Sequence, residues 1–257
     1  MKLATWNVNS LKVRLPQVLD WLEANNPDVL CLQETKVQDQ NFPLDEITKI
    51  GYQSVFVGQK TFNGVALLSK TVGDDVVTEI PSFDDVQKRV IAATYDDVRV
   101  ICVYIPNGES VESDKYQYKL SWLKALHAWL QEEMVKYPKL SLLGDYNIAP
   151  ADQDTYDAAA WKDKVLCSQL ERDSYQALLD LGLADSFRLF DQPEKSYTWW
   201  DYRMMAFRRN RGMRIDHILL SESLSRQCTS CVIDKAVRKL ERPSDHAPVM
   251  VELAKIS

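Results

Sequence analysis

Short apolar runs recur along the chain between polar turns, which is the pattern of β-strands. Rich in Val, Ile, Leu and aromatic residues, they predict strands at residues 2–8, 28–33, 52–57, 64–69, 90–95, 98–105, 140–145, 215–221 and 247–253. Only Asp96 and Asp97 separate two of these runs, so we expect that pair to form an antiparallel hairpin. Strands therefore dominate the predicted structure.

Three segments instead show the spacing of an amphipathic helix. Apolar residues recur at helical intervals between Leu11 and Leu22 and between Trp122 and Met134, and a third helix is expected near residues 171–181. Helices separate some strands, whereas short turns connect others. This mixture predicts an α/β (α+β) fold with two mixed, mainly antiparallel β-sheets packed face to face and helices outside. No repeat or linker divides the chain, so residues 1–257 are expected to form a single domain.

The composition is that of a globular protein with a substantial core, since 46% of the 257 residues are hydrophobic and 26% are charged. Apolar stretches such as residues 100–105 fall far short of the roughly 18 residues that span a bilayer, so no membrane segment is predicted. The start of the chain lacks the apolar core of a secretory signal, and a cytoplasmic location is expected. Five cysteines favour reduced thiols, and Cys228 and Cys231 are interpreted as strand residues because a second pair of zinc ligands is missing.

Charge is distributed unevenly. A net charge of −6 argues against a protein that binds nucleic acid by bulk electrostatics alone. The segment 203–214 nevertheless concentrates five arginines among apolar residues: Arg203, Arg208, Arg209, Arg211 and Arg214. Two interpretations stay open for it, a phosphate-binding loop and a solvated loop with scattered arginines.

Common catalytic signatures are missing from the sequence, including G-x-G-x-x-G, the P-loop, G-x-S-x-G and H-E-x-x-H. Instead, five apolar runs end in, or lead to, carboxylates and amides: Asn7, Glu34, Asp145 with Asn147, Asp216, and Asp245 with His246. A single such residue is more often a cap or a turn, but five of them predict a site.

These residue types indicate the chemistry. Clustered carboxylates repel a phosphate unless a cation lies between them, and oxygen ligands favour a hard ion, Mg²⁺ or Mn²⁺. His246 is the neighbouring group that titrates near neutral pH, and Asp216 is the best candidate to fix its tautomer and favour its charge. A buried structural histidine is the alternative, and it is the favoured interpretation for His127 and His217.

The motifs, taken in order, resemble those of the exonuclease III family of abasic-site endonucleases over residues 2–253. They are W-N-V-N (6–9), L-Q-E-T-K (32–36), G-V-A-L-L-S (64–69), Y-I-P-N (104–107), G-D-Y-N (144–147), Y-T-W-W (197–200), R-I-D-H (214–217) and S-D-H-A-P (244–248). The W-N, Q-E, G-D-x-N and S-D-H elements are shared by the wider endonuclease, exonuclease and phosphatase superfamily. The others are narrower and point to its DNA-repair branch.

The resemblance implies a four-layer α/β sandwich and a Mg²⁺-dependent DNA-repair hydrolase that acts on double-stranded DNA, in a bacterial cytoplasm at the nucleoid. A monomer is expected by default. By this resemblance Glu34 would be the principal metal ligand. Asn7 and Asp245 would lie close to the ion or reach it through water. Asp145 would orient or deprotonate the attacking water. The phosphate would be held by Tyr104, Asn147 and His246, the last positioned by Asp216.

Specificity residues follow from the same resemblance. Trp199, Met213 and Ile215 would line a pocket for the abasic sugar, although Met213 replaces a tryptophan of some members and Asn9 an aspartate of others. Cys167, a small residue near that pocket, mildly favours abasic incision. The residues expected to flank the duplex are Asn9, Lys36, Phe62, Asn63, Asn107, Arg208, Arg209 and Arg211.

The leading hypothesis is incision 5′ to abasic sites that leaves a 3′-hydroxyl, with 3′-phosphodiesterase, 3′-phosphatase and 3′–5′ exonuclease activity beside it. An enzyme that mainly processes blocked 3′ ends is the nearest alternative. A phosphodiesterase of inositol phosphates or sphingomyelin is disfavoured by the narrower motifs. A DNA-end binding protein without activity is disfavoured because Glu34, Asp145, Asn147, Asp216 and His246 are all present.

Overall fold

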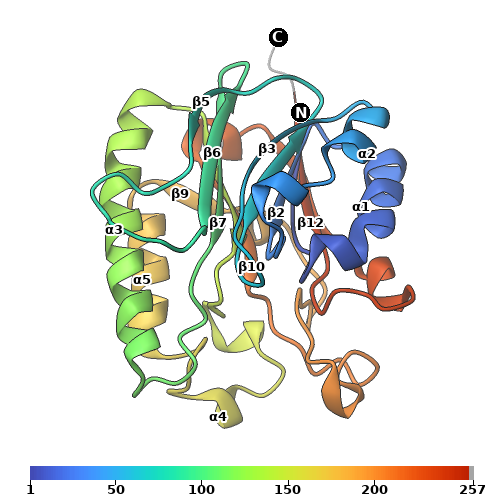
Figure 1. Cartoon of the computed structure of the whole chain (residues 1–257). Helices are drawn as coiled ribbons and strands as arrows, with labels where there is room; N and C mark the ends of the chain where they lie inside the picture. The colour runs from blue at the N-terminus through green and yellow to red at the C-terminus, as the bar shows by residue number, and fades with distance from the viewer. Residues whose placement is uncertain (255–257) are drawn as a thin grey trace.

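In the computed structural model, which describes residues 1–254, two six-stranded sheets pack face to face between layers of helices (Figure 1). The first sheet has the order β11 (Cys228–Ile233), β12 (Val249–Leu253), β1 (Lys2–Asn7), β2 (Val29–Gln33), β4 (Val65–Ser69) and β3 (Gln53–Val57). The second has the order β5 (Asp74–Val77), β6 (Val90–Tyr95), β7 (Val98–Tyr104), β8 (Leu140–Asp145), β10 (Asp216–Ser221) and β9 (Leu183–Asp185). The predicted four-layer sandwich is therefore confirmed.

Strand pairing is mainly antiparallel, as predicted. Only β1 with β2 and β7 with β8 pair in parallel among the named strands of residues 1–254. The expected hairpin exists, because β6 and β7 pair antiparallel with Tyr95 opposite Val98. The short strands β5 and β9 were not anticipated, since four and three residues are too few to show a pattern.

Alternation along the strands divides the apolar side chains between layers. Leu3 and Val29 face the core between the sheets, whereas their neighbours Ala4 and Leu30 face the outer core under the helices. The α1 helix (Leu11–Asn25) and the α2 helix (Leu44–Lys49) cover this outer face of the first sheet.

The second sheet is covered by α3 (Asp114–Lys136) and α5 (Gln169–Asp180), which lie side by side in Figure 1. Ser113 caps α3 by accepting a hydrogen bond from the backbone N–H of Tyr116, so this helix starts well before the apolar stripe from which it was predicted. Ser168 and Glu171 form a capping box that starts α5.

The remaining helical segments are short. The α4 helix (Ala158–Trp161) and the α6 helix (Glu222–Ser225) each make about one turn. The 3₁₀ turns are Asp39–Asn41, Asp152–Asp154, Ser186–Leu189, Arg203–Met205 and Lys235–Lys239. No helix within residues 1–254 has the length and apolar character needed to cross a membrane.

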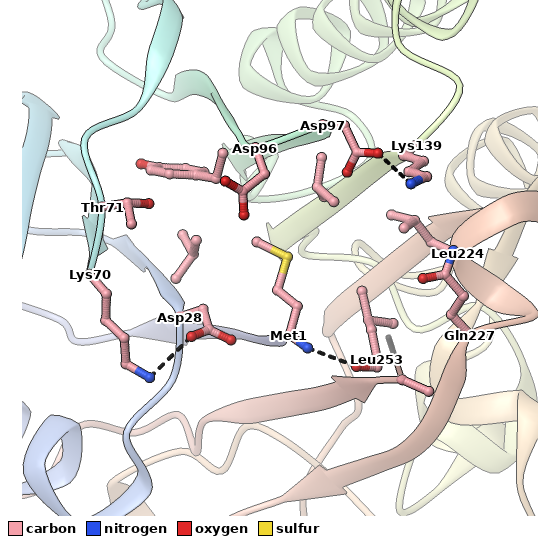
Figure 2. A pocket seen from close by; sticks show the side chains of 14 residues that line it. Met1, Asp28, Lys70, Thr71, Asp96, Asp97, Lys139, Leu224, Gln227 and Leu253 are labelled. Carbon is pink, nitrogen blue, oxygen red and sulfur yellow. Dashed lines mark hydrogen bonds and ion pairs between the residues drawn. The ribbon is translucent and has the colours of Figure 1, made fainter. Parts of the chain in front are cut away.

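The edge of the sandwich where β1 begins contains a cavity of about 360 Å³ around Met1 (Figure 2). Four of its charged side chains form two ion pairs, Lys70 with Asp28 and Lys139 with Asp97. The N-terminal ammonium group donates a hydrogen bond to the Leu253 carbonyl. These contacts close the end of the sandwich away from the polar motifs.

Candidate active site

The polar motifs meet at the other edge because of the way the strands pair. The β1 and β2 strands run parallel, so Asn7 and Glu34 emerge at the same end of the first sheet. In the second sheet, Tyr104 lies beside Asp145 in the parallel pair β7–β8. The β10 strand runs the opposite way and begins with Asp216 directly opposite Asp145. Residues far apart in the sequence thus reach one place.

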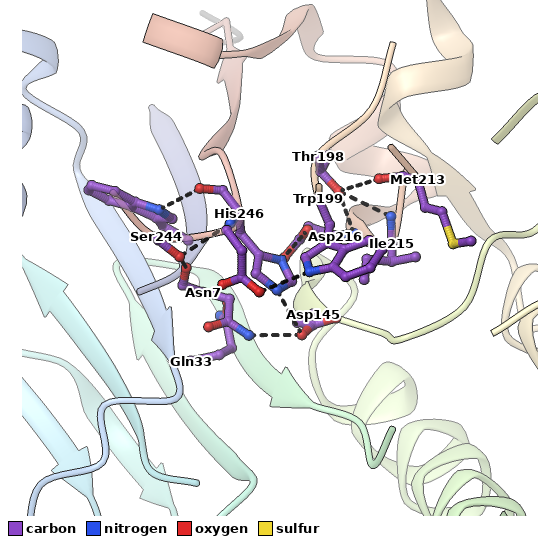
Figure 3. A network of polar contacts seen from close by, with 12 residues as sticks. Asn7, Gln33, Asp145, Thr198, Trp199, Met213, Ile215, Asp216, Ser244 and His246 are labelled. Atoms are coloured by element: carbon purple, nitrogen blue, oxygen red, sulfur yellow. Dashed lines mark hydrogen bonds and ion pairs between the residues drawn. The ribbon is translucent and has the colours of Figure 1, made fainter. Parts of the chain in front are cut away.

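A chain of charged groups runs through His246 (Figure 3). Its Nδ1 lies 2.9 Å from Asp216 Oδ2, and its Nε2 lies 3.8 Å from Asp145 Oδ2. Burial lowers the pKa of His246, but Asp216 and Asp145 outweigh it and raise the pKa to about 10. These carboxylates favour the charged form of the imidazole, and its Nε2 lies on the side of Asp145. The predicted pairing of Asp216 with His246 is found in the structure.

Asn7 joins the two carboxylates of the site. Its Nδ2 donates hydrogen bonds of 2.9 Å to Glu34 Oε1 and to Asp145 Oδ2, and its Oδ1 accepts from the backbone N–H of Asn9. Burial raises the pKa of Asp145, His246 opposes this, and Asp216 and Glu34 add to it. Burial and the negative charges of Glu34 and Asp145 raise the pKa of the Tyr104 hydroxyl well above its usual value.

The donor set fits a hard divalent cation. Ligand atoms of Glu34, Asp145 and His246 lie within 4.8 Å of one another. Glu34 and Asp145 offer carboxylate oxygens, which are the ligands that a hard divalent cation prefers. The site already accommodates one positive charge, because Lys36 Nζ lies 2.8 Å from Glu34 Oε2. Oxygen ligands of this kind suit Mg²⁺ or Mn²⁺.

Two amides stand beside Asp145. The backbone N–H of Asn147 donates to Asp145 Oδ1 at 2.9 Å, and Asn147 Nδ2 donates to the Ile105 carbonyl at 2.9 Å. Asn107 Nδ2 in turn donates to Asn147 Oδ1 at 3.0 Å. Asn147 has a left-handed backbone (φ 51°), a strained conformation of the kind that functional sites retain.

Asp245, the residue before His246, also lines the site. It accepts hydrogen bonds from Asn9 Nδ2 at 2.9 Å and from Trp199 Nε1 at 3.0 Å. Burial raises the pKa of Asp245, but His246 and these donors outweigh it and lower the pKa. Lys36 Nζ donates to Asn9 Oδ1 at 2.7 Å, which connects the Asp245 side of the site to Glu34. Metal ligation by Asn7 or Asp245 remains a prediction.

A cavity of about 300 Å³ opens onto these groups. Its apolar wall consists of Trp161, Val165, Leu166, Trp199 and Ile215. Trp199 and Ile215 were expected there.

Two other residues expected at the cavity, Met213 and Cys167, are buried behind the wall, where they pack with Ile215 and Leu166. The small residue Cys167 is therefore not part of the cavity wall, whereas its bulky neighbour Leu166 is. Adjacent residues of an irregular loop point in different directions, and the effect of Cys167 on abasic incision stays a prediction.

The residues expected to flank the duplex differ in exposure. Phe62 is 65% exposed, Asn63 is buried beneath it, and Arg208, Arg209 and Arg211 are exposed.

Arg214 corrects the interpretation of the arginine-rich segment. It is 1% exposed and pairs with Asp154 and Asp185 at 2.7 and 2.8 Å. It therefore cannot reach a DNA phosphate. His217, whose Nδ1 lies 2.9 Å from Arg214 Nη1, has the structural role favoured for it from the sequence.

Several residues near the site were missed from the sequence. Trp161 ends the one-turn α4 helix, and Val165 and Leu166 lie in the irregular segment that follows it, so none of them stood out in the sequence. Lys119 lies behind the site at 0% exposure, and it gave a usable signal, because a charged residue on the apolar stripe of a helix is unusual.

The model of the Endonuclease/Exonuclease/phosphatase family matches residues 4–246. The chain belongs to this family. Exodeoxyribonuclease III of Haemophilus influenzae is 38% identical over 98% of this chain and 99% of its own length.

Two solved structures of family members are similar along the whole chain. One is the 3′ phosphatase NExo from Neisseria, in an aspartate-to-asparagine variant bound to a product DNA hairpin; it is 50% identical with a TM-score of 0.98 and covers 99% of this chain and 100% of its own. The other is an AP endonuclease from Archaeoglobus fulgidus, 38% identical with a TM-score of 0.94 over 98% and 99% of the two chains. The protein is therefore a DNA nuclease of the exodeoxyribonuclease III and AP endonuclease type.

Proposed function

We propose that this nuclease mainly processes 3′ ends of DNA, hydrolysing 3′-phosphates and terminal nucleotides with Mg²⁺, and incises abasic sites poorly. The observation that carries this proposal is the wall of the cavity. Leu166 presents a bulky side chain beside Trp161 and Val165, where an abasic sugar turned out of a duplex would have to fit. A terminal phosphate needs only to reach the polar edge of the cavity.

The comparisons support the same order of activities. The relative at 50% identity is described as a 3′ phosphatase, whereas the AP endonuclease is 38% identical. Abasic incision, the leading hypothesis from the sequence, is the second candidate. It is favoured by the apolar character of the wall, because Trp199 and Ile215 would pack against a sugar that lacks its base.

The residues have complementary tasks in this hydrolysis. Protonated His246 donates a charge-assisted hydrogen bond from Nε2 to a phosphate oxygen, and Asp216 holds the ring in place. Asn147 and Tyr104 contribute uncharged donors. Asp145 accepts a proton from the attacking water or orients it.

Glu34 and Asp145 would hold the divalent ion, which when bound neutralises charge on the phosphate and on the leaving oxygen. Hydrogen bonds that hold His246, Asn107 and Asn147 before the phosphate binds lower the barrier, because little reorganisation is needed as negative charge develops.

A panel of three duplexes tests the proposal, one ending in a 3′-phosphate, one with a recessed 3′-hydroxyl and one with a single internal abasic analogue. We expect phosphate release to be fastest and abasic incision slowest. Leu166→Ala should raise abasic incision selectively, because it removes bulk from the wall. The matched control is Leu170→Ala, an exposed leucine on α5 that should leave all three rates unchanged. Abasic incision at a rate equal to phosphate release in the wild-type protein would overturn the order proposed.

A further inference from the structure

A fully buried ion pair lies directly behind the site. Lys119 on α3 and Glu171 on α5 are both 0% exposed, with Lys119 Nζ 2.5 Å from Glu171 Oε1. Removing two charges from water costs several kcal/mol per ion, and well-packed apolar residues often replace such a pair without loss of stability. Stability alone is therefore a weak explanation for this pair, and the other bonds it makes point to its role.

Lys119 connects two loops of the site. Its ammonium group donates to the carbonyl of Asn147 at 2.7 Å and to the carbonyl of Asn107 at 3.2 Å, in addition to Glu171. An ammonium group has three protons, so all of its donors are used. These two asparagines are the ones whose side-chain amides bond to each other beside Asp145.

Glu171 fixes a third loop. Its Oε1 accepts from the backbone N–H of Leu166 at 3.0 Å, and its Oε2 accepts from the backbone N–H and the hydroxyl of Ser168 at 3.0 and 2.6 Å. Leu166 has a left-handed backbone (φ 73°), which is costly for a residue with a branched side chain. Its carbonyl accepts a hydrogen bond from Ala149 in the loop that also carries Asn147. The carboxylate thus holds the cavity wall in its strained conformation.

We propose that Lys119 and Glu171 are positioning residues that hold the Asn107, Asn147 and Leu166 loops in the arrangement that receives the DNA phosphate. They do not touch the substrate. They set the peptide planes from which the two amides and the cavity wall project. The kinetic test of this inference rests on the proposed function, because it measures phosphate release. The structural test, which follows amide NMR signals, does not.

The test replaces the pair by apolar residues in the double variant Lys119→Met with Glu171→Leu, which leaves no unpaired charge. The chain provides a matched control in Arg99 and Glu133, a buried pair that joins β7 to the far end of the same helix at 2.7 Å. The control is Arg99→Met with Glu133→Leu. Both variants are compared well below their melting temperatures.

We expect kcat for 3′-phosphate release to fall by about 100-fold in the Lys119/Glu171 variant, because small misplacements of catalytic groups carry penalties of this size. DNA affinity measured in chelator should change little, since the surface contacts remain. The control should keep kcat within about threefold, because its pair lies away from the site. Equal kcat values in the two double variants would overturn the proposal.

A second readout does not depend on the activity. The side-chain amide NMR signals of Asn107 and Asn147 should move in the Lys119/Glu171 variant and stay in place in the control. If the double variant does not fold, Glu171→Gln replaces it; the added amide protons face the N–H of Ser168, so the same signals should still shift. Unmoved signals would refute the positioning role, whereas moved signals in a protein without phosphatase activity would refute only the proposed function.

Discussion

Arg214→Met tests whether Arg214 stabilises the buried core or binds a DNA phosphate. The structure indicates the first role, and the arginine-rich segment suggested the second. The guanidinium bonds to Asp154 and Asp185, and Nη1 lies 2.9 Å from His217 Nδ1. Burial raises the pKa of Asp185, but Arg214 outweighs it and lowers the pKa, so this carboxylate is charged when folded. The substitution would therefore leave buried negative charge without its main partner.

Loss of one partner of a buried pair costs about 3 to 5 kcal/mol. In a chain of this size that corresponds to a melting temperature lower by about 10 °C. Urea unfolding followed by tryptophan fluorescence measures the free energy of unfolding directly.

The matched control is Arg226→Met, which breaks a pair with Glu222 whose two side chains are 74% exposed and should therefore matter little. DNA binding by the folded Arg214 variant should keep the wild-type dependence on salt. A free energy of unfolding equal to that of the control would refute the structural role, and a weaker salt dependence would restore the phosphate contact.

Three further predictions follow from the surface, the core and the metal. Arg209→Ala should weaken DNA binding and reduce the slope of log K against log salt by about 0.9, because it removes one phosphate contact from an exposed loop; an unchanged slope would exclude that contact. Burial, then Arg214, lowers the pKa of His217 from 6.5 to about 4, so the folded state binds fewer protons than the unfolded state between these values. The stabilisation is full above pH 6.5 and is lost as the pH falls toward 4, by at most about 3 kcal/mol. His217→Gln keeps a hydrogen-bond donor and an acceptor, so the free energy of unfolding should fall less between pH 6.5 and 4 in urea titrations from pH 4 to 8. An unchanged fall would assign it to other groups. Chelation should abolish phosphate release and either Mg²⁺ or Mn²⁺ should restore it; activity that persists in excess chelator would rule out the ion.

The sheets and the reacting groups could be predicted because they follow from local patterns. Alternation of apolar residues marks the strands, and a polar residue that interrupts such a run at its end is visible without coordinates. The pairing of Asp216 with His246 was anticipated for this reason, since both groups end or precede apolar runs. The extent of the domain remains a prediction.

The errors lie where tertiary contacts decide. Arg214 looked like a member of an exposed basic loop, but two distant aspartates draw it into the core. Leu166, rather than Cys167, lines the cavity. The direction of a side chain in an irregular loop depends on its backbone angles, and Glu171 holds those of Leu166. Such long-range bonds have no local sequence pattern.

The central claim is that Asp145, between Asn7 and protonated His246, activates water against a DNA phosphate beside a bound divalent ion. Release of inorganic phosphate from a 3′-phosphate duplex by Asp145→Asn, with DNA affinity measured in parallel, tests it most directly. We predict that turnover falls by about 100-fold to 10,000-fold while affinity stays near that of the wild-type protein. Turnover close to the wild-type rate would contradict the claim.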